Sequence, residues 1–330
     1  MEKKKFKINF HLVFALLVIA VIAIFVAKFW GFGRIITRAD IATIPVPENP
    51  EIQAYDNFMP NIMEDDGTFP EDDGVTTVVC LGNNPFSDDR GDADNVCEMF
   101  ADATGATVYN CSIPGSYLSA KEFTFLEDTY PMDAFSLYWL TTGFCVDNDA
   151  IFDTAIAAME DNGEDVLPEL KDSVKTLRSI DFEKVDFIYI MYDGSDYFAS
   201  RPVSNPELGT DVQTFAGATA ASIDLIRTSY PWIRIIVMSP TYAFAIDENG
   251  DYISSDIKKY GGSTLSAYVL DQYATAYNLH TTFIDNIYGT FYEDIARDYL
   301  SDNLHLNQKG RELVVVRMIE AMENESEIIR

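Results

Sequence analysis

Apolar and polar positions alternate in blocks along most of this chain. Short apolar runs with the character of strands are separated by longer stretches with helical spacing. The expected strands cover residues 75–81, 106–112, 185–192, 233–239 and 281–285. The expected helices cover 92–104, most of 117–180, 209–229, 263–279 and 307–324. Because strands separated by helices need crossover connections, the pattern predicts a three-layer, flavodoxin-like α/β domain, with a parallel sheet and helices on both faces.

The chain opens with a different pattern. No polar residue occurs from Leu12 to Ala27, and with its flanking residues the apolar span covers residues 10–30. That length suffices to cross roughly 30 Å of hydrocarbon. A buried soluble helix would have a polar face, and a cleaved signal peptide would have a shorter apolar core and a small-residue cleavage site. The sequence therefore predicts an uncleaved anchor in a lipid bilayer.

The charges beside the apolar span predict its orientation and the domain order. Four lysines lie within residues 1–9, so this tail is expected in the cytoplasm. Residues 31–74 contain five prolines and many acidic residues, which indicates a spacer. The α/β domain is expected over residues 75–325. The sequence thus predicts a single-pass protein of the cell membrane with its C-terminal domain outside the cytoplasm.

The composition narrows the class of partner. The formal net charge is −30, with 53 acidic residues against 23 basic ones, which argues against nucleic acid as a partner. The four cysteines, Cys80, Cys97, Cys111 and Cys145, lack the spacing of a metal site. Cys80 and Cys111 fall in strand-like runs, where buried free thiols are expected, although a location outside the cytoplasm permits disulfides. The sequence predicts neither a metal nor a cofactor.

Glycine and polar residues collect where the expected strands end. The first strand runs into Gly82-Asn83-Asn84, and the second is followed by Gly115. The third is followed by "YDGSDYF", which contains Ser195 and Asp196. Ligands of open α/β sheets bind outside the carboxyl ends of the strands, so these residues are expected at one site.

A further block, "DNLHLNQKG", lies directly before the closing helix. It places Asp302 three residues before His305, one of only three histidines in the chain. A histidine acting as general base is held in one tautomer by a carboxylate on its far nitrogen, and this spacing lets one turn of loop present both groups.

Together these blocks resemble the SGNH or GDSL hydrolases over roughly residues 75–322. The resemblance implies that His305 is the general base and Asp302 its carboxylate partner. It also implies that the backbone N–H of Gly115 belongs to an oxyanion hole, and that Gly82 belongs to the first block. Asp196 matches the aspartate of the third block.

The chain departs from that family at its most reactive position. Asn84 stands where the family has its nucleophilic serine, and Asn83 stands where it has aspartate. Ser195 replaces the asparagine that supplies an oxyanion contact, although a hydroxyl can still donate one hydrogen bond there. An amide cannot be deprotonated to attack a carbonyl as serine can. The base and part of the oxyanion hole are therefore expected, whereas the nucleophile is missing.

Three interpretations of the missing nucleophile stay open. The loop needs no nucleophile, because asparagine tolerates left-handed backbone geometry and Pro85 fixes the turn. Alternatively, Ser87 is a substitute nucleophile, or His305 activates water directly. We favour the first, with Ser87 in a solvated position at a helix entry.

Two functions follow from the resemblance, and they belong to different classes. The first is ester hydrolysis or acyl transfer, such as acetyl transfer, on a cell-surface glycan or a small ester at the cell envelope. The second is a catalytically inactive pseudo-hydrolase that binds a glycan or supports a membrane partner. Because a fold alone does not determine function, the geometry of the site must distinguish them.

Overall fold

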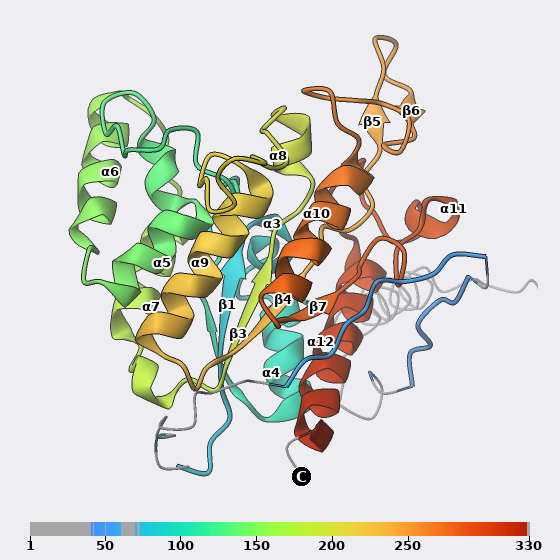
Figure 1. Ribbon diagram of the computed structural model, residues 1–330, viewed down its shortest axis with the longest axis horizontal. Helices are drawn as coiled ribbons and strands as arrows, with labels where there is room; N and C mark the ends of the chain where they lie inside the picture. The colour runs from blue at the N-terminus through green and yellow to red at the C-terminus, as the bar shows by residue number, and fades with distance from the viewer. Residues whose placement is uncertain (1–40, 42, 50, 61–69, 71–72, 329–330) are drawn as a thin grey trace, which may run out of the picture. The chain divides into compact units, whose positions relative to one another are not determined.

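The computed structural model describes residues 41, 43–49, 51–60, 70 and 73–328, with side chains up to Asn324. All five expected strands form, and they pair in parallel in the order β2-β1-β3-β4-β7 (Figure 1). Their bounds are Thr77–Gly82 for β1, Thr107–Asn110 for β2, Phe187–Met191 for β3, Arg234–Met238 for β4 and Thr282–Ile284 for β7. The central strands β1 and β3 are buried along their whole length, as unbroken apolar runs predict. The predicted parallel α/β sheet is confirmed.

Helices cover both faces of the sheet. On one face α4 (Val96–Thr104) packs against α12 (Gln308–Ile328), and on the other α9 (Phe215–Ser229) packs between α5 (Leu137–Cys145) and α10 (Leu265–Asn278) (Figure 1). The helices α6 (Ala150–Asp161) and α7 (Pro168–Ser179) follow α5 in the chain.

The bounds of α4 show how the sequence sets a helix. The side chain of Asn95 accepts hydrogen bonds from the backbone of Cys97 and Glu98 at the start, and Gly105 ends the helix with φ of 74°. Apolar side chains of α4 at helical spacing are buried beneath it, namely Val96, Met99, Phe100 and Ala103.

The segment 117–136 is not helical, contrary to the expectation for 117–180. It is a loop that ends in the short 3-10 helix η1 (Pro131–Phe135). In a helix, backbone carbonyls would accept the N–H groups of this segment. Here buried carboxylates accept several of them: Asp196 accepts those of Leu118 and Ser119, and Asp133 accepts that of Lys121. Because Asp196 comes from a distant part of the chain and Asp133 bonds twelve positions back, helical periodicity could not reveal the loop.

Several short elements also escaped the sequence pattern. The hairpin of β5 (Ala245–Ile246) and β6 (Tyr252–Ile253) has two residues per strand, too few for a periodic signal. The single-turn helices α3 (Asn84–Ser87), α8 (Ser195–Phe198) and α11 (Glu293–Ala296) and the 3-10 helix η2 (Phe182–Lys184) are equally brief. Both α3 and α8 lie directly beyond the ends of β1 and β3, where the site residues were expected.

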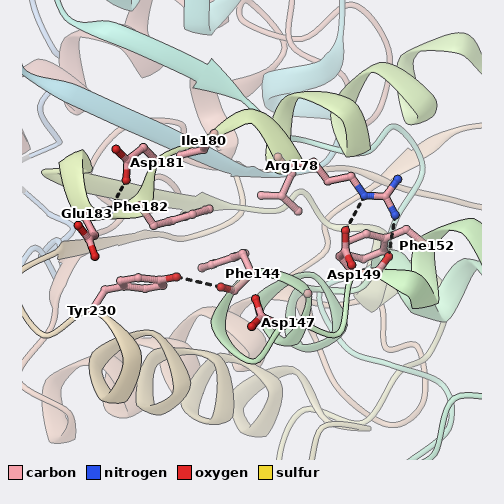
Figure 2. A pocket seen from close by; sticks show the side chains of 12 residues that line it. Phe144, Asp147, Asp149, Phe152, Arg178, Ile180, Asp181, Phe182, Glu183 and Tyr230 are labelled. Atoms are coloured by element: carbon pink, nitrogen blue, oxygen red, sulfur yellow. Dashed lines mark hydrogen bonds and ion pairs between the residues drawn. The ribbon is translucent and has the colours of Figure 1, made fainter.

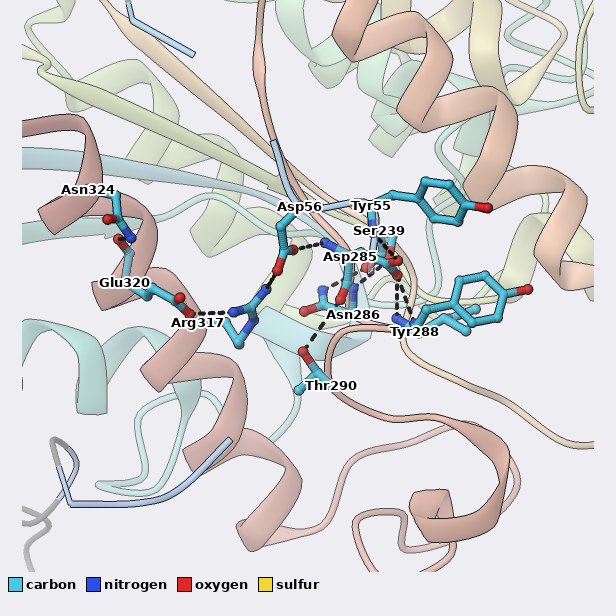
Figure 3. A network of polar contacts seen from close by, with 11 residues as sticks. Tyr55, Asp56, Ser239, Asp285, Asn286, Tyr288, Thr290, Arg317, Glu320 and Asn324 are labelled. Atoms are coloured by element: carbon cyan, nitrogen blue, oxygen red, sulfur yellow. Dashed lines mark hydrogen bonds and ion pairs between the residues drawn. The ribbon is translucent and has the colours of Figure 1, made fainter. Parts of the chain in front are cut away.

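Part of the expected spacer lies along the edge of the sheet. Asn57 pairs with Phe283 of β7 in an antiparallel bridge, with N–O distances of 2.9 and 2.8 Å. Next to it, the carboxylate of Asp56 accepts the backbone N–H of Asp285 and pairs with the guanidinium of Arg317, which is 3% exposed (Figure 3). Residues 55–59 therefore form a strap across β7, although the sequence assigned them to a linker.

The predicted membrane anchor, residues 10–30, lies outside the described residues, as does the cytoplasmic tail 1–9. Among the helices that the structure does describe, none combines the length and apolar character that crossing a bilayer requires. All four cysteines are free; Cys80, Cys97 and Cys111 are buried, which agrees with the expectation of buried thiols in the strands.

Candidate functional site

The site begins where β1 and β3 end side by side. Gly82 is the last residue of β1, and a Cβ atom there would lie 1.9 Å from the carbonyl oxygen of Met191, the last residue of β3. Only glycine permits this close approach of the two strands. It brings the residues after β1, Asn83 and Asn84, next to Asp193, which follows β3.

Asp193 joins the two amides. Its Oδ1 accepts a hydrogen bond from Nδ2 of Asn83 at 2.8 Å, and its Oδ2 accepts one from Nδ2 of Asn84 at 2.7 Å. Asn83 is fully buried; its Oδ1 accepts the backbone N–H of Asp193 at 2.9 Å, and its Nδ2 also donates to the carbonyl of Ser116. Asn83 thus holds three loops together, as a buried polar group with all its partners can.

The other end of the Asn84 amide is bonded as well. The backbone N–H of Gly115 donates to Oδ1 of Asn84 at 3.1 Å. Gly115 has φ of 70°, a conformation that glycine adopts without strain. The N–H that the sequence assigned to an oxyanion hole therefore already has an acceptor, and the side chain of Asn84 spans from that N–H to Asp193.

Asp302 and His305 form the predicted pair. Nδ1 of His305 lies 2.7 Å from Oδ2 of Asp302, while Oδ1 of Asp302 accepts the backbone N–H groups of Leu304 and His305. These bonds fix the ring, and its other nitrogen, Nε2, has no hydrogen-bond partner in the described part of the chain. The two side chains remain 39% and 49% exposed, so an outside molecule can reach them.

The loop that carries His305 is positioned over the end of β3. The backbone N–H of Phe244 donates to the carbonyl of Asn303 at 2.8 Å, and Nδ2 of Asn303 donates to the carbonyl of Phe244 at 3.0 Å. The next residue, Leu304, lies against Gly194. Because Gly194 lies beyond the carboxyl end of β3, as residues 82–87 lie at that of β1, the contact with Leu304 places the pair at the same edge of the sheet.

The charges around His305 shift its pKa. Partial burial alone would lower the pKa, but the hydrogen bond with Asp302 and the negative charges of Asp88 and Asp193 outweigh it and raise the pKa above its ordinary value. Burial raises the pKa of Asp88 to about 6, although His305 opposes the rise. Burial would raise the pKa of Asp302 too, but its backbone hydrogen bonds and His305 lower it. The carboxylates around His305 therefore stabilise its protonated form.

Three other residues named from the sequence have different surroundings. Asp196 is 1% exposed and binds the backbone of Leu118 and Ser119, so it shapes the 115–119 loop. Ser195 begins α8, and its backbone N–H donates to Asp193. Ser87 is 6% exposed, and its Oγ is enclosed without a partner among the described residues, so the expectation of a solvated Ser87 was wrong. The turn of α3 directs it into the protein.

Comparison with known proteins supports the architecture. No protein-family model matches the chain, and no curated protein matches it significantly. Among solved structures, one from Lactobacillus plantarum aligns with a TM-score of 0.52 at 14% identity, covering 76% of this chain and 97% of that one. Another aligns with a TM-score of 0.51 at 21% identity over 76% of this chain and 97% of that one. A carbohydrate acetylesterase from Sinorhizobium meliloti aligns with a TM-score of 0.43 at 12% identity, covering 76% and 99%.

The chain shares its fold with the first two of these structures, and this is the α/β fold expected from the resemblance to the SGNH hydrolases. Within this fold the side chain at position 84, at the end of β1, is an amide rather than a hydroxyl. A site arranged in this way offers hydrogen-bond donors and acceptors and the imidazole of His305, but residue 84 cannot form an acyl-enzyme as serine does.

Sequence reasoning missed the residue that joins the two amides of this site. Asp193 accepts hydrogen bonds from both amides and from the backbone of Ser195, but within the block "YDGSDYF" only Ser195 and Asp196 were given a role. Its position directly after β3 was an available signal, because such positions line ligand sites in α/β sheets. The influence of Asp88 on His305 depends on the turn of α3 and could not be read from spacing.

Proposed function

We propose that this protein is a pseudo-hydrolase: it uses an SGNH-like site to bind a ligand and does not hydrolyse it through a serine. The observation that carries the proposal is the double attachment of Asn84. Its Nδ2 donates to Asp193, and its Oδ1 accepts the N–H of Gly115. An amide held at both ends is a structural element, and it engages the donor that an oxyanion would need.

The ligand that we propose is a glycan of the cell surface, bound while the domain is tethered outside the cytoplasm by residues 10–30. The apolar span of the sequence supports the tether. The exposed polar groups of the site, above all His305 and Asp302, support recognition of a hydroxyl-rich or acylated molecule by hydrogen bonds. A small ester is the alternative ligand of the same site.

A second candidate function is hydrolysis by water that His305 activates. The intact pair of His305 and Asp302, with a Nδ1–Oδ2 distance of 2.7 Å and an unbonded Nε2, favours it. Because the pKa of His305 is raised, this route would need a higher pH than an unperturbed histidine would, since only a neutral imidazole accepts a proton from water. This route would also require Asn84 to release the N–H of Gly115.

Hydrolysis of an activated acetyl ester separates the two candidates. The wild type is expected to be inert, because loss of the nucleophile from a catalytic triad costs on the order of a million-fold in rate. Asn84→Ser should gain activity, and Asn84→Ala is the matched control that removes the amide without adding a hydroxyl. Recovery in Asn84→Ser should be lost again when His305→Ala is added.

Other outcomes would change the conclusion. A wild type that is active, with activity abolished by His305→Ala and untouched by Ser87→Ala, would establish the water route. Activity abolished by Ser87→Ala would make Ser87 the nucleophile. An inert wild type whose binding to acetylated and deacetylated oligosaccharides is unaffected by His305→Ala would refute ligand binding at this site.

A further inference from the structure

A cavity lies at the edge of the sheet opposite to His305. It has a volume of about 490 Å³ and is formed where α5, α7, α9 and η2 end or begin (Figure 2). Phe182 in η2 precedes β3, and Tyr230 precedes β4, so both lie at the amino ends of their strands. The size falls within the range of small-molecule sites, and the position separates this cavity from His305 at the carboxyl ends.

One wall of the cavity is a stack of aromatic rings. Phe144 and Phe182 lie parallel, with ring centroids 4.3 Å apart and an angle of 1°. Tyr230 also packs on Phe182, with centroids 5.3 Å apart, and lies 6.5 Å from Phe144; its hydroxyl donates to the carbonyl of Phe144 at 3.0 Å (Figure 2). The rings are therefore fixed in place, and aromatic faces fixed in this way attract cations through their quadrupole.

The rest of the lining is negatively charged. Four carboxylates line the cavity, on Asp147, Asp149, Asp181 and Glu183. Arg178 is the single basic residue in the lining, and its guanidinium is already bound to Asp149 at 2.7 Å and to Asp153 at 2.8 Å.

The remaining carboxylates act on the aromatic wall. Burial raises the pKa of Tyr230, and the Cys145 thiol and the charges of Asp147, Glu183 and Asp181 raise it further. Asp181 forms an ion pair with Lys184, with 3.9 Å between Oδ2 and Nζ, whereas Asp147 and Glu183 form no ion pair within the described residues. The cavity thus combines a fixed aromatic wall with two uncompensated carboxylates.

We infer that this cavity is a binding site for a small organic cation, of the alkylammonium class. The apolar substituents of such a cation would contact the rings of Phe144 and Tyr230, which are more exposed than Phe182 behind them. Its charge would be balanced by Asp147 and Glu183. An anion or a phosphate-bearing ligand would be repelled by the same carboxylates. The site is independent of the pseudo-hydrolase function.

Calorimetric titration of the full-length protein in a non-ionic detergent tests the inference, with choline as the probe. The matched control ligand is 3,3-dimethylbutan-1-ol, which has the shape of choline without its charge. We expect saturable binding of choline and at least roughly tenfold weaker binding of the alcohol. The double variant Asp147→Asn/Glu183→Gln should weaken choline binding by a similar factor.

Two further variants complete the test. Asp161→Asn/Glu164→Gln removes the same charge outside the cavity and should leave choline binding unchanged, as should His305→Ala at the other edge. Absence of saturable choline binding would overturn the inference. Equal binding of the neutral alcohol, or equal loss of affinity in the control double variant, would overturn it too, because the effect would then be apolar contact or net charge alone.

Discussion

Asp193 and Asn84 are joined side chain to side chain across the ends of β3 and β1, with 2.7 Å between Oδ2 and Nδ2. The bond explains why an amide is retained at the end of β1. A serine hydroxyl at position 84 is too short to reach both Asp193 and the N–H of Gly115, whereas the amide reaches both. In this protein, position 84 therefore organises the loops around the site.

The first prediction concerns the stability that Asp193 supplies. Asp193→Ala leaves the buried amide donor of Asn83 with one acceptor fewer and the amide of Asn84 with none for its Nδ2. We expect the free energy of unfolding to fall by about 2–3 kcal/mol, measured by urea denaturation. The exposed Asp92→Ala should change it by less than about 0.5 kcal/mol. An unchanged stability in Asp193→Ala would contradict the network.

A second prediction concerns the pKa of His305, measured by NMR titration of its ring proton. The pKa should lie above the ordinary value of about 6.5. Asp302→Asn should lower it most, and Asp88→Asn should lower it less. Asp102→Asn, an exposed change on α4, should have no effect. A wild-type pKa below 6.5, or an effect of Asp102→Asn equal to that of Asp88→Asn, would show that these carboxylates do not act on His305.

The same shifts determine how stability depends on pH. Because folding raises the pKa of His305, its contribution is complete below the unfolded pKa and is lost as the pH rises through the folded pKa. Because folding lowers the pKa of Asp302, its contribution is present above the unfolded pKa and is lost as the pH falls through the folded value. The pair should therefore stabilise the protein most at pH values above the titration of Asp302 and below the titration of His305. In Asp302→Asn that maximum should flatten.

The sequence predicted the sheet and the His305 pair for definite physical reasons. Unbroken apolar runs such as β1 and β3 have few alternatives to burial in a parallel sheet. The spacing of Asp302 and His305 is local, so a single turn of loop brings them together. Predictions of this kind depend on contacts between residues close in sequence.

The remainder of the site depends on contacts that no local pattern contains. Asp193 meets Asn83 across 110 positions of the chain, and Asp196 reaches Ser119 across 77. The strap at Asp56 pairs with Arg317 across 261 positions. The strap is held by backbone hydrogen bonds, by the ion pair of Asp56 and by ring contacts of Tyr55, all with residues more than 200 positions away.

The third prediction tests that strap. Asp56→Asn weakens the pairing of Arg317, a guanidinium only 3% exposed, and should lower the free energy of unfolding by about 1–3 kcal/mol in urea denaturation. The loss should stay limited because Glu320 also binds Arg317. Glu51→Gln, an exposed change near the strap, is the matched control. Equal stability of both variants would show that the strap contributes nothing.

A fourth prediction concerns the N-terminal span and the truncation point. The full-length protein should stay with the membrane fraction and require detergent for extraction, whereas removal of residues 1–40 should give a soluble, folded domain. Removal of residues 1–60 also deletes the strap and should lower the unfolding midpoint relative to the shorter truncation. Full-length protein recovered without detergent would exclude the anchor.

The central claim is that residue 84 occupies the position of a nucleophile and that an amide there abolishes serine chemistry. The most direct measurement is the intact mass of the protein after treatment with a fluorophosphonate, which labels activated serines. We predict no adduct on the wild type or on Asn84→Ala, one adduct on Asn84→Ser, and loss of that adduct when His305→Ala is added. An adduct on the wild type, or none on a folded Asn84→Ser protein, would contradict the account.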